Sequence, residues 1–292
     1  MIILIEKEAW KRVWGGIDTS YSQDKIISQW DMFEKMKIKF LENLFPRCGE
    51  NGRQVKSLEC GCGGATVSVY FSKKGYKIFA FDFVNEALQL ARRNFRKAGG
   101  QGEPFFADVE NIPMKNNVFD VVMSFGLIEH FPEDKVEAQI KEMVRVLKPG
   151  GLLFLDIYAR GYHLKKKSFQ CENIGRIFNF VACFTASLLE SLSLKEAYSK
   201  AILIFVPGFF ENQLPLEYYE RAAKAAGIID VSAHGNRPFP ALYLPHFLGA
   251  LYIAFMKRCE PLWSKFDNSK SRFSRYLGAG WWLYGTKGET GN

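Results

Sequence analysis

The stretch that decides the fold is Leu58-Glu59-Cys60-Gly61-Cys62-Gly63-Gly64-Ala65-Thr66. It joins the apolar end of a predicted strand to the start of a predicted helix. Glycine tolerates positive φ and lets a ligand approach the backbone closely. At such a junction, the free N–H groups and the dipole of the helix favour an anionic group. A glycine turn alone serves several nucleotide cofactors, so the neighbouring residues must narrow the choice.

Three acidic residues stand at the ends of three predicted strands. Glu59 lies two residues before the first glycine, where its carboxylate would attract a cationic amino group and repel a dinucleotide pyrophosphate. Asp82 ends the second strand, at the spacing expected for a ribose-binding carboxylate, and Asp108 ends the third. Because ligands of open α/β sheets bind outside the carboxyl ends of the strands, we expect all three acids to face one crevice.

Predicted strands and helices alternate along the middle of the chain. The predicted strands are Val55–Glu59, Lys77–Phe81, Pro104–Ala107, Asp120–Ser124 and Leu152–Ile157, joined by helices at Ala65–Lys74, Asn85–Ala98 and Glu133–Leu147. These strands are continuous apolar runs, which indicates a doubly wound α/β fold whose parallel sheet is buried on both faces. The helix Pro215–Ala226 and the strands Ile228–Ala233 and Trp281–Thr286 resume the pattern. We therefore predict an N-terminal helical cap (1–50), a Rossmann-like domain (51–160, 214–235 and 278–288) and two lid insertions that bind substrate (161–213 and 236–277).

Together, these motifs resemble the class I (Rossmann-like) S-adenosylmethionine-dependent methyltransferases, in particular the small-molecule group that includes quinone and sterol methylases. The family pattern E-x-G-x-G-x-G is met by Glu59, Gly61 and Gly63, with Ala65 in place of the last glycine and Gly64 beside it to relieve the change. The corner Leu147–Gly151 also matches. The resemblance implies a seven-stranded sheet in the order 3-2-1-4-5-7-6, whose last strand is antiparallel.

The resemblance also implies a cofactor, S-adenosyl-L-methionine, and a product, S-adenosyl-L-homocysteine. It assigns the ribose to Asp82, the adenine to Asp108 and the methionine moiety to Ser124, Phe125 and Gly126. Tyr21 in the N-terminal cap is expected to close over the cofactor. The complete set of expected cofactor-binding residues is Glu59, Gly61, Cys62, Gly63, Asp82, Phe83, Asp108, Val109, Ser124, Phe125, Gly126 and Tyr21.

Methyl transfer is an in-line displacement from a sulfonium, so the protein mainly orients the reactants and excludes water. A base is needed only where the acceptor must lose a proton, and His130, His163 and Tyr158 are the candidates. The acceptor is expected to be a small molecule, partly apolar or lipid-like. Whether oxygen, nitrogen or carbon receives the methyl group stays open at this point.

Composition limits the class of protein and the cellular compartment in which we expect it. The 292 residues are 48% apolar and carry a net charge of +8. None of the six cysteines completes a metal-ligand set or suggests a disulfide framework, so we expect no metal and a cytoplasmic protein. The N-terminus has no signal-peptide pattern. The longest apolar run, 241–256, is shorter than the roughly 20 residues of a membrane-spanning helix.

The two predicted insertions are aromatic and basic. Lys165–Lys167 are consecutive lysines, and residues 257–276 carry a net charge of +4. The aromatic residues either form a small core of the lid or line an apolar tunnel or a membrane-docking surface, with the basic residues facing lipid phosphates. They are Phe169, Phe178, Phe180, Phe184, Phe205, Phe209, Phe210, Tyr243, Phe247, Tyr252 and Phe255.

Two other functions compete with this interpretation. A nucleic-acid (RNA) methyltransferase would suit the basic charge, but base-amino methylases need an Asp/Asn-Pro-Pro-Tyr/Phe loop, where this chain has Ser124-Phe125-Gly126-Leu127. The chain also has no Pro-Cys nucleophile of the cytosine-C5 type. A non-catalytic partner protein that binds S-adenosylmethionine is the second alternative, and the complete set of Glu59, Asp82 and Asp108 argues against it.

Overall fold

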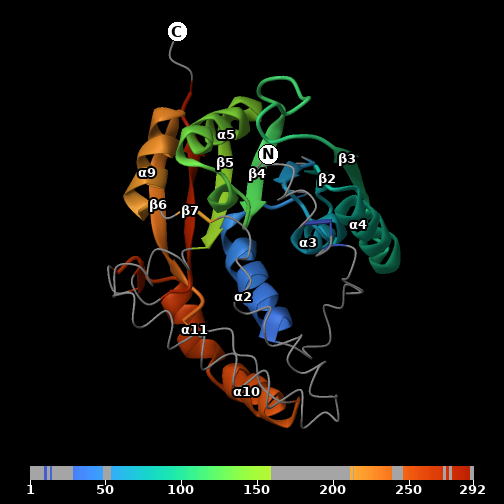
Figure 1. Ribbon diagram of the computed structural model, residues 1–292, viewed down its shortest axis with the longest axis vertical. Coiled ribbons are helices and arrows are strands. Elements are labelled where there is room, and N and C mark those ends of the chain that lie inside the picture. Colours follow the sequence, from blue (N-terminus) through green and yellow to red (C-terminus); the bar gives the residue numbers. More distant parts are fainter. Residues whose placement is uncertain are drawn as a thin grey trace, which may run out of the picture.

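The computed structural model describes residues 10, 11, 14, 29–48, 54–158, 211, 212, 214–238, 246–271, 274, 275 and 278–289. Its centre is a seven-stranded sheet in the order β3-β2-β1-β4-β5-β7-β6 (Figure 1). The pairs among β1 to β5 are parallel, and β7 runs antiparallel to both β5 and β6. The predicted fold class and strand order are therefore confirmed. The strands are β1 Lys56–Cys60, β2 Lys77–Asp82, β3 Gly102–Phe106, β4 Phe119–Phe125, β5 Leu147–Tyr158, β6 Ile228–Asn236 and β7 Gly280–Lys287.

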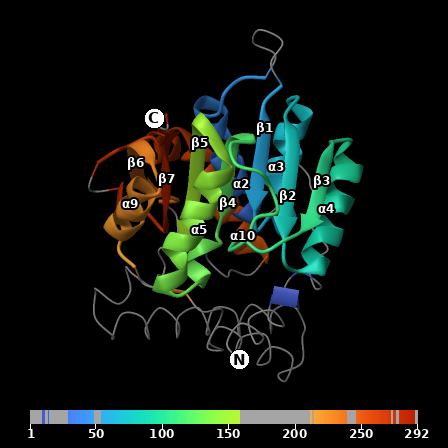
Figure 2. The ribbon, with the colours of Figure 1, turned by 90° about the horizontal axis from the view of Figure 1, so that it is seen from above.

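Helices cover both faces of this sheet, as the continuous apolar strands predict. On one face, α5 (Glu133–Val146) and α9 (Leu216–Ala225) pack over a core that includes Phe119, Leu153 and Leu283. On the other, α2 (Gln29–Leu44), α3 (Thr66–Lys73) and α4 (Asn85–Ala98) pack over a second core that includes Phe154 and Trp282. Figure 2 shows α5 and α2 on opposite sides of the central strands.

Helix α2 runs from the carboxyl edge of the sheet to the amino edge. Lys37 in its middle reaches Asp156 in β5, and Pro46 just after it accepts a hydrogen bond from the hydroxyl of Tyr76, which precedes β2. The first half of α2 packs against α10 (His246–Arg258) and α11 (Glu260–Asp267), beneath it in Figure 1. This third apolar cluster is formed by Met32, Phe33, Met36, Met256 and Trp263.

Both predicted insertions begin at the carboxyl edge of the sheet. Gly280, the first residue of β7, pairs with Tyr158 at the end of β5 and with Asn236 at the end of β6. The chain between β6 and β7 includes α10 and α11, whereas almost all of 161–213 lies outside the described residues. The predicted domain boundaries and the lid function stay predictions.

The largest boundary difference concerns β5, which begins at Leu147 rather than at the predicted Leu152. A corner such as Pro149-Gly150-Gly151 normally ends a helix and separates it from the next strand. Instead, Gly150 adopts a φ of +70° and the register with β4 shifts between Phe119 and Val121, so the strand passes through an irregularity. Among the described helices, none has the length and apolarity needed to cross a membrane.

Candidate cofactor-binding site

The glycine turn after β1 adopts the left-handed conformation at alternate positions. Gly61, Gly63 and Ala65 have φ angles of +65°, +49° and +54°. The expectation that Gly64 relieves the missing third glycine is wrong, because Gly64 is not at positive φ and Ala65 itself takes the left-handed conformation. A methyl group in this conformation is sterically unfavourable, so the surrounding packing must hold Ala65 in place.

Asp82 fastens this turn to the end of β2. Its Oδ2 accepts a hydrogen bond from the backbone N–H of Gly63, and its Oδ1 accepts one from that of Val84, both at 2.9 Å. Burial raises the pKa of the Asp82 carboxyl, while these N–H groups act in the opposite direction. A carboxylate oxygen has more than one lone pair, so Asp82 keeps acceptor capacity for ribose hydroxyls. Its place at the strand end fits the predicted ribose role.

Glu59 is a buried carboxyl group at the same edge, only 3% exposed. It stands in β1 beside Ala80 of β2 and Met123 of β4. Burial raises the pKa of the Glu59 carboxyl to about 8, although Ser68 and Lys37 each act to lower this pKa. Its Oε2 has no hydrogen-bond partner among the described residues. A buried acceptor that lacks a donor fits a ligand with a cationic amino group, which would supply both a proton donor and a positive charge.

The predicted adenine residues follow β3. Asp108 is exposed, and its Oδ1 accepts a hydrogen bond from the N–H of Glu110 at 2.9 Å, which makes a tight turn. Val109 is buried in the core that also contains Phe81, so its backbone is the part left for a ligand. Phe83, after β2, is half-buried. Their contacts with a nucleoside stay predictions.

The end of β4 lies beside the end of β1, since Ser124 pairs with Cys60. The hydroxyl of Ser124 is buried without a partner among the described residues. Gly126 has a φ of +65° and donates its N–H to the carbonyl of Asp156. Phe125 between them is half-buried, with its ring 4.7 Å from the ammonium group of Lys37. The structure thus brings the predicted methionine-lining residues next to Glu59.

The two cysteines of the glycine turn are free thiols. Cys62 is buried, donates its N–H to the carbonyl of Phe81 at 2.8 Å and has a thiol pKa raised well above its usual value by burial. Such a thiol is a small apolar side chain at neutral pH. Within the part of the chain that the structure describes, no group of histidine, cysteine and acidic residues could hold a metal ion.

A charged cluster under the carboxyl edge was missed by the sequence analysis. The carboxylate of Asp156 pairs with Arg237, Nη2 to Oδ1, at 2.5 Å and with Lys37, Nζ to Oδ2, at 3.3 Å. All three side chains are buried. Arg237 also stacks over the ring of Tyr158, with its guanidinium carbon 3.9 Å from the ring centroid. Burial would raise the pKa of Asp156, but the two cations lower it, so Asp156 stays a carboxylate.

The short 3₁₀ helix η2 (Ile128–His130) after β4 carries a second unpredicted acid. Glu129 is fully buried, and its Oε1 accepts a hydrogen bond from the N–H of Tyr158 at 2.9 Å. Its Oε2 has no partner among the described residues, and burial raises its pKa to about 8. Glu129 therefore ties the segment after β4 to the end of β5, close to Gly126.

Two tryptophans of the N-terminal segment lie over this edge. A Cβ added to Gly63 would meet the ring of Trp14 at 2.4 Å, and the ring of Trp10 lies edge-on to His130 with centroids 5.0 Å apart. The candidate bases His130 and Tyr158 are thus both at the carboxyl edge. Tyr21 and His163, predicted to close over the cofactor and to accept a proton, lie outside the described residues.

Comparisons with known proteins agree with this geometry. A family model described as a methyltransferase domain matches residues 58–151. The ubiquinone/menaquinone biosynthesis C-methyltransferase of Wigglesworthia glossinidia brevipalpis is 30% identical over 185 residues, which cover 59% of this chain and 72% of that protein. The chain belongs to the class I, S-adenosylmethionine-dependent methyltransferases, and the family resemblance seen in the sequence is confirmed.

Other matches are more partial. The ubiquinone biosynthesis O-methyltransferase of Idiomarina loihiensis is 29% identical over 126 residues, or 43% of this chain and 49% of that protein. The chain therefore spans about half the length of the ubiquinone O-methyltransferases that it matches. A phosphoethanolamine N-methyltransferase 2 of Haemonchus contortus, solved with phosphomonomethylethanolamine and S-adenosylhomocysteine, shares the fold with a TM-score of 0.53 at 17% identity, over 97% of this chain and 57% of that one.

Proposed function

We propose that this chain transfers the methyl group of S-adenosylmethionine to a small, partly apolar acceptor at the carboxyl edge of the sheet. The observation that carries the proposal is the buried, unpartnered oxygen of Glu59 beside a glycine turn that Asp82 holds in place. A carboxylate there suits the cationic amino group of the cofactor. The relatives' names support a small acceptor, since they include ubiquinone biosynthesis and phosphoethanolamine methyltransferases.

Each part of the cofactor has proposed residues on this edge. Glu59 receives the amino group, Asp82 the ribose hydroxyls, and Asp108 with Val109 the adenine. At the turn residues Gly61, Cys62 and Gly63 the cofactor can approach the backbone closely. Phe83 lies beside the nucleoside. Ser124, Phe125 and Gly126 line the methionine moiety, and the N-terminal segment with Tyr21 closes over it. When bound, the cofactor supplies an activated methyl group whose carbon–sulfur bond breaks as the acceptor–carbon bond forms.

The chain's own contribution to the reaction is orientation and shelter from water. Trp10 lies against His130 of η2 and Trp14 against Gly63 of the glycine turn, where both rings would keep water from the bound cofactor. Where the acceptor must lose a proton, His130, His163 and Tyr158 are the proposed acceptors of that proton. Replacing each in turn and measuring kcat against pH tests them, since only loss of a base removes the acidic limb of the profile.

Calorimetry with S-adenosylhomocysteine tests the cofactor site. The wild-type chain should bind it, and Glu59→Ala should weaken binding at least about tenfold, as expected for a lost buried charge pair. A screen with labelled cofactor against quinone precursors, phosphoethanolamine and RNA then tests the acceptor class. Labelling of RNA alone would favour the nucleic-acid alternative, and tight binding with no labelling of any acceptor would favour a non-catalytic partner protein.

A further inference from the structure

Helices α10 and α11 form an almost continuous rod beneath α2 (Figure 1). Hydrogen bonds from Cys259 N–H to the Phe255 carbonyl, at 3.0 Å, and from Trp263 N–H to the Cys259 carbonyl, at 2.9 Å, carry the helical ladder across the junction. One side of the rod is buried, because Met256 and Trp263 pack against α2. Of the aromatic residues predicted for the insertions, Tyr252 packs partly buried against this cluster.

The other side of the rod is apolar and exposed. Leu248, Leu251, Phe255 and Leu262 are 38%, 64%, 51% and 67% exposed. Their spacing of three, four and seven residues places them on one side of a helix. Trp30, at the start of the neighbouring α2, adds a further ring that is 48% exposed. Single exposed apolar residues are ordinary, but four that share one side of a helix pair favour a contact surface.

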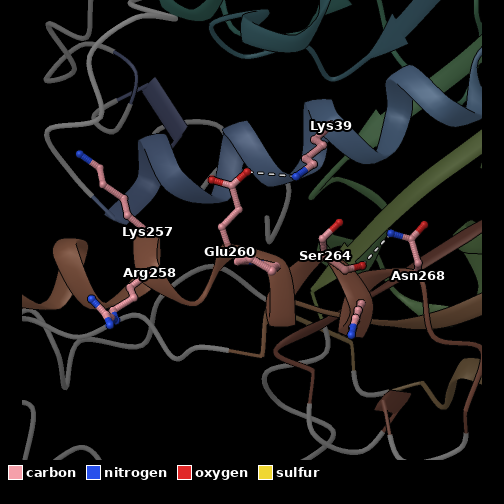
Figure 3. A pocket seen from close by; sticks show the side chains of 8 residues that line it. Lys39, Lys257, Arg258, Glu260, Ser264 and Asn268 are labelled. Carbon is pink, nitrogen blue, oxygen red and sulfur yellow. Dashed lines mark hydrogen bonds and ion pairs between the residues drawn. The ribbon is translucent and has the colours of Figure 1, made fainter.

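Basic residues accompany the exposed leucines. Arg258 and Lys265 follow Leu251 by seven and fourteen residues, so they lie on the same side of the rod. Here, the "α10–α11 surface" means Leu248, Leu251, Phe255, Arg258, Leu262 and Lys265. Next to it, between α2 and the rod, is an open hollow of about 590 Å³ (Figure 3). Its lining residues are Lys39, Lys257, Arg258, Glu260, Pro261, Ser264, Lys265 and Asn268.

The hollow favours anions. Its single acid, Glu260, pairs with Lys35 at 2.6 Å and with Lys39 at 3.0 Å, and the dashed line between Glu260 and Lys39 in Figure 3 marks the second pair. These contacts hold the pKa of Glu260 below its ordinary value. Two lysines therefore neutralise the one carboxylate, and Arg258 and Lys265 add two further positive charges to the lining.

We propose that the α10–α11 surface docks on an anionic lipid bilayer. Leu251, Phe255 and Leu262 enter the boundary between headgroups and acyl chains, and the basic residues of the hollow meet the lipid phosphates. Exposed leucines and a phenylalanine next to Arg258 and Lys265 combine the apolar and cationic contacts that an interfacial membrane anchor makes. Nucleic acid would match the charge of the hollow but leave three large apolar side chains in water.

The docking surface is joined to the cofactor edge. At the end of α11, the Oδ1 of Asp267 accepts a hydrogen bond from the N–H of Arg237 at 3.2 Å. Arg237 in turn pairs with Asp156 and stacks on Tyr158. The α10–α11 surface is thus linked through the buried Arg237 to Tyr158, the last residue of β5. Because docking requires no methyl transfer, its test is independent of the proposed function.

Flotation of the full chain with lipid vesicles tests the proposal. The wild-type chain should float with vesicles of phosphatidylcholine and phosphatidylglycerol, and should remain at the bottom of the gradient with phosphatidylcholine alone. Added salt should weaken the binding because the phosphate contacts are screened. Arg258→Glu with Lys265→Glu, and separately Leu251→Ser with Leu262→Ser, should each lower the partition coefficient at least about tenfold.

Matched controls come from exposed residues elsewhere in the fold. Arg96→Glu with Lys97→Glu on α4 changes the net charge by the same amount, and Ile229→Ser in β6 removes an apolar side chain that is 51% exposed. Both controls should float like the wild type, and all variants should keep its thermal midpoint. No flotation of the wild type, or equal losses in the α4 and rod charge variants, would overturn the proposal. A third result would also overturn it: the wild type does not float but self-associates, and Leu251→Ser with Leu262→Ser abolishes the self-association. The surface would then join two copies of this chain.

Discussion

The carboxylate of Asp82 binds Gly63 and so joins the strand–helix junction after β1 to the one after β2. One oxygen accepts the N–H of Gly63 in the turn after β1, and the other accepts the N–H of Val84 after β2, each at 2.9 Å. With Asp82 only 5% exposed, water has little access to either N–H group. The residue predicted from its position to hold a ribose therefore also determines the shape of the glycine turn.

Asp82→Ala should consequently affect both folding and binding. Two buried N–H groups lose their acceptors, at about 1–3 kcal/mol each, so the free energy of unfolding should fall by about 2–6 kcal/mol. Affinity for S-adenosylhomocysteine should fall at least about tenfold. The control is Asp108→Ala, where the exposed carboxylate serves one turn and the loss of stability should stay within about 0.5 kcal/mol. Equal losses in urea denaturation would contradict this account.

Cofactor binding should release a proton from Glu59. With a pKa of about 8 before binding, the Glu59 carboxyl is mostly protonated at pH 7. A cationic amino group placed beside it favours the carboxylate, so close to one proton should leave on binding. Affinity for S-adenosylhomocysteine should then rise as the pH rises from 7 to about 8. Calorimetry in buffers of different ionisation enthalpy measures the release. Glu59→Gln should abolish it, and a proton count that this change leaves unaltered would refute the assignment.

The sheet and its cofactor edge were predictable because their signals are local. A continuous apolar run predicted Asp120–Ser124, and β4 spans Phe119–Phe125. The glycine turn and the acids Glu59 and Asp82 follow from strand ends that the same runs define. The start of β5 was missed because an irregular strand passes through a Pro-Gly-Gly corner that normally ends a helix.

The charged cluster was not predictable, since it joins distant segments. Lys37 comes from α2, Asp156 from β5 and Arg237 from just after β6, with no spacing that relates them. Asp156 did carry a signal, as an acid inside the otherwise apolar Leu152–Ile157, because a buried carboxylate needs a cationic partner. The contact of Trp14 with Gly63 is equally long-range. Only the folded chain shows which aromatic residue covers the turn.

Gly61→Ala should cost more stability than the same change at Gly99. Both glycines have a φ of +65°, so the conformational penalty of about 1–2 kcal/mol is shared. A Cβ at Gly61 would also meet Leu127 Cδ1 at 2.8 Å, whereas a Cβ at Gly99 would meet nothing within 4 Å. The extra loss at Gly61 should be about 1–3 kcal/mol, the usual range for overpacking. Thermal denaturation of the pair measures the difference, and identical midpoints would show that Leu127 moves aside freely.

Lys37→Met should destabilise the fold far more than Lys35→Met on the same helix. The ammonium group of Lys37 is buried between Glu34, at 2.8 Å, and Asp156, at 3.3 Å. Its removal leaves the buried Asp156 with one cation fewer, which should cost about 2–4 kcal/mol even though Arg237 remains. Lys35 is 44% exposed and pairs with Glu260 at the surface, so its loss should cost less than about 1 kcal/mol. Urea denaturation at neutral pH compares the two variants. If Lys37→Met matches Lys35→Met, then Arg237 alone satisfies Asp156, and the cluster does not hold α2 against the carboxyl edge of the sheet.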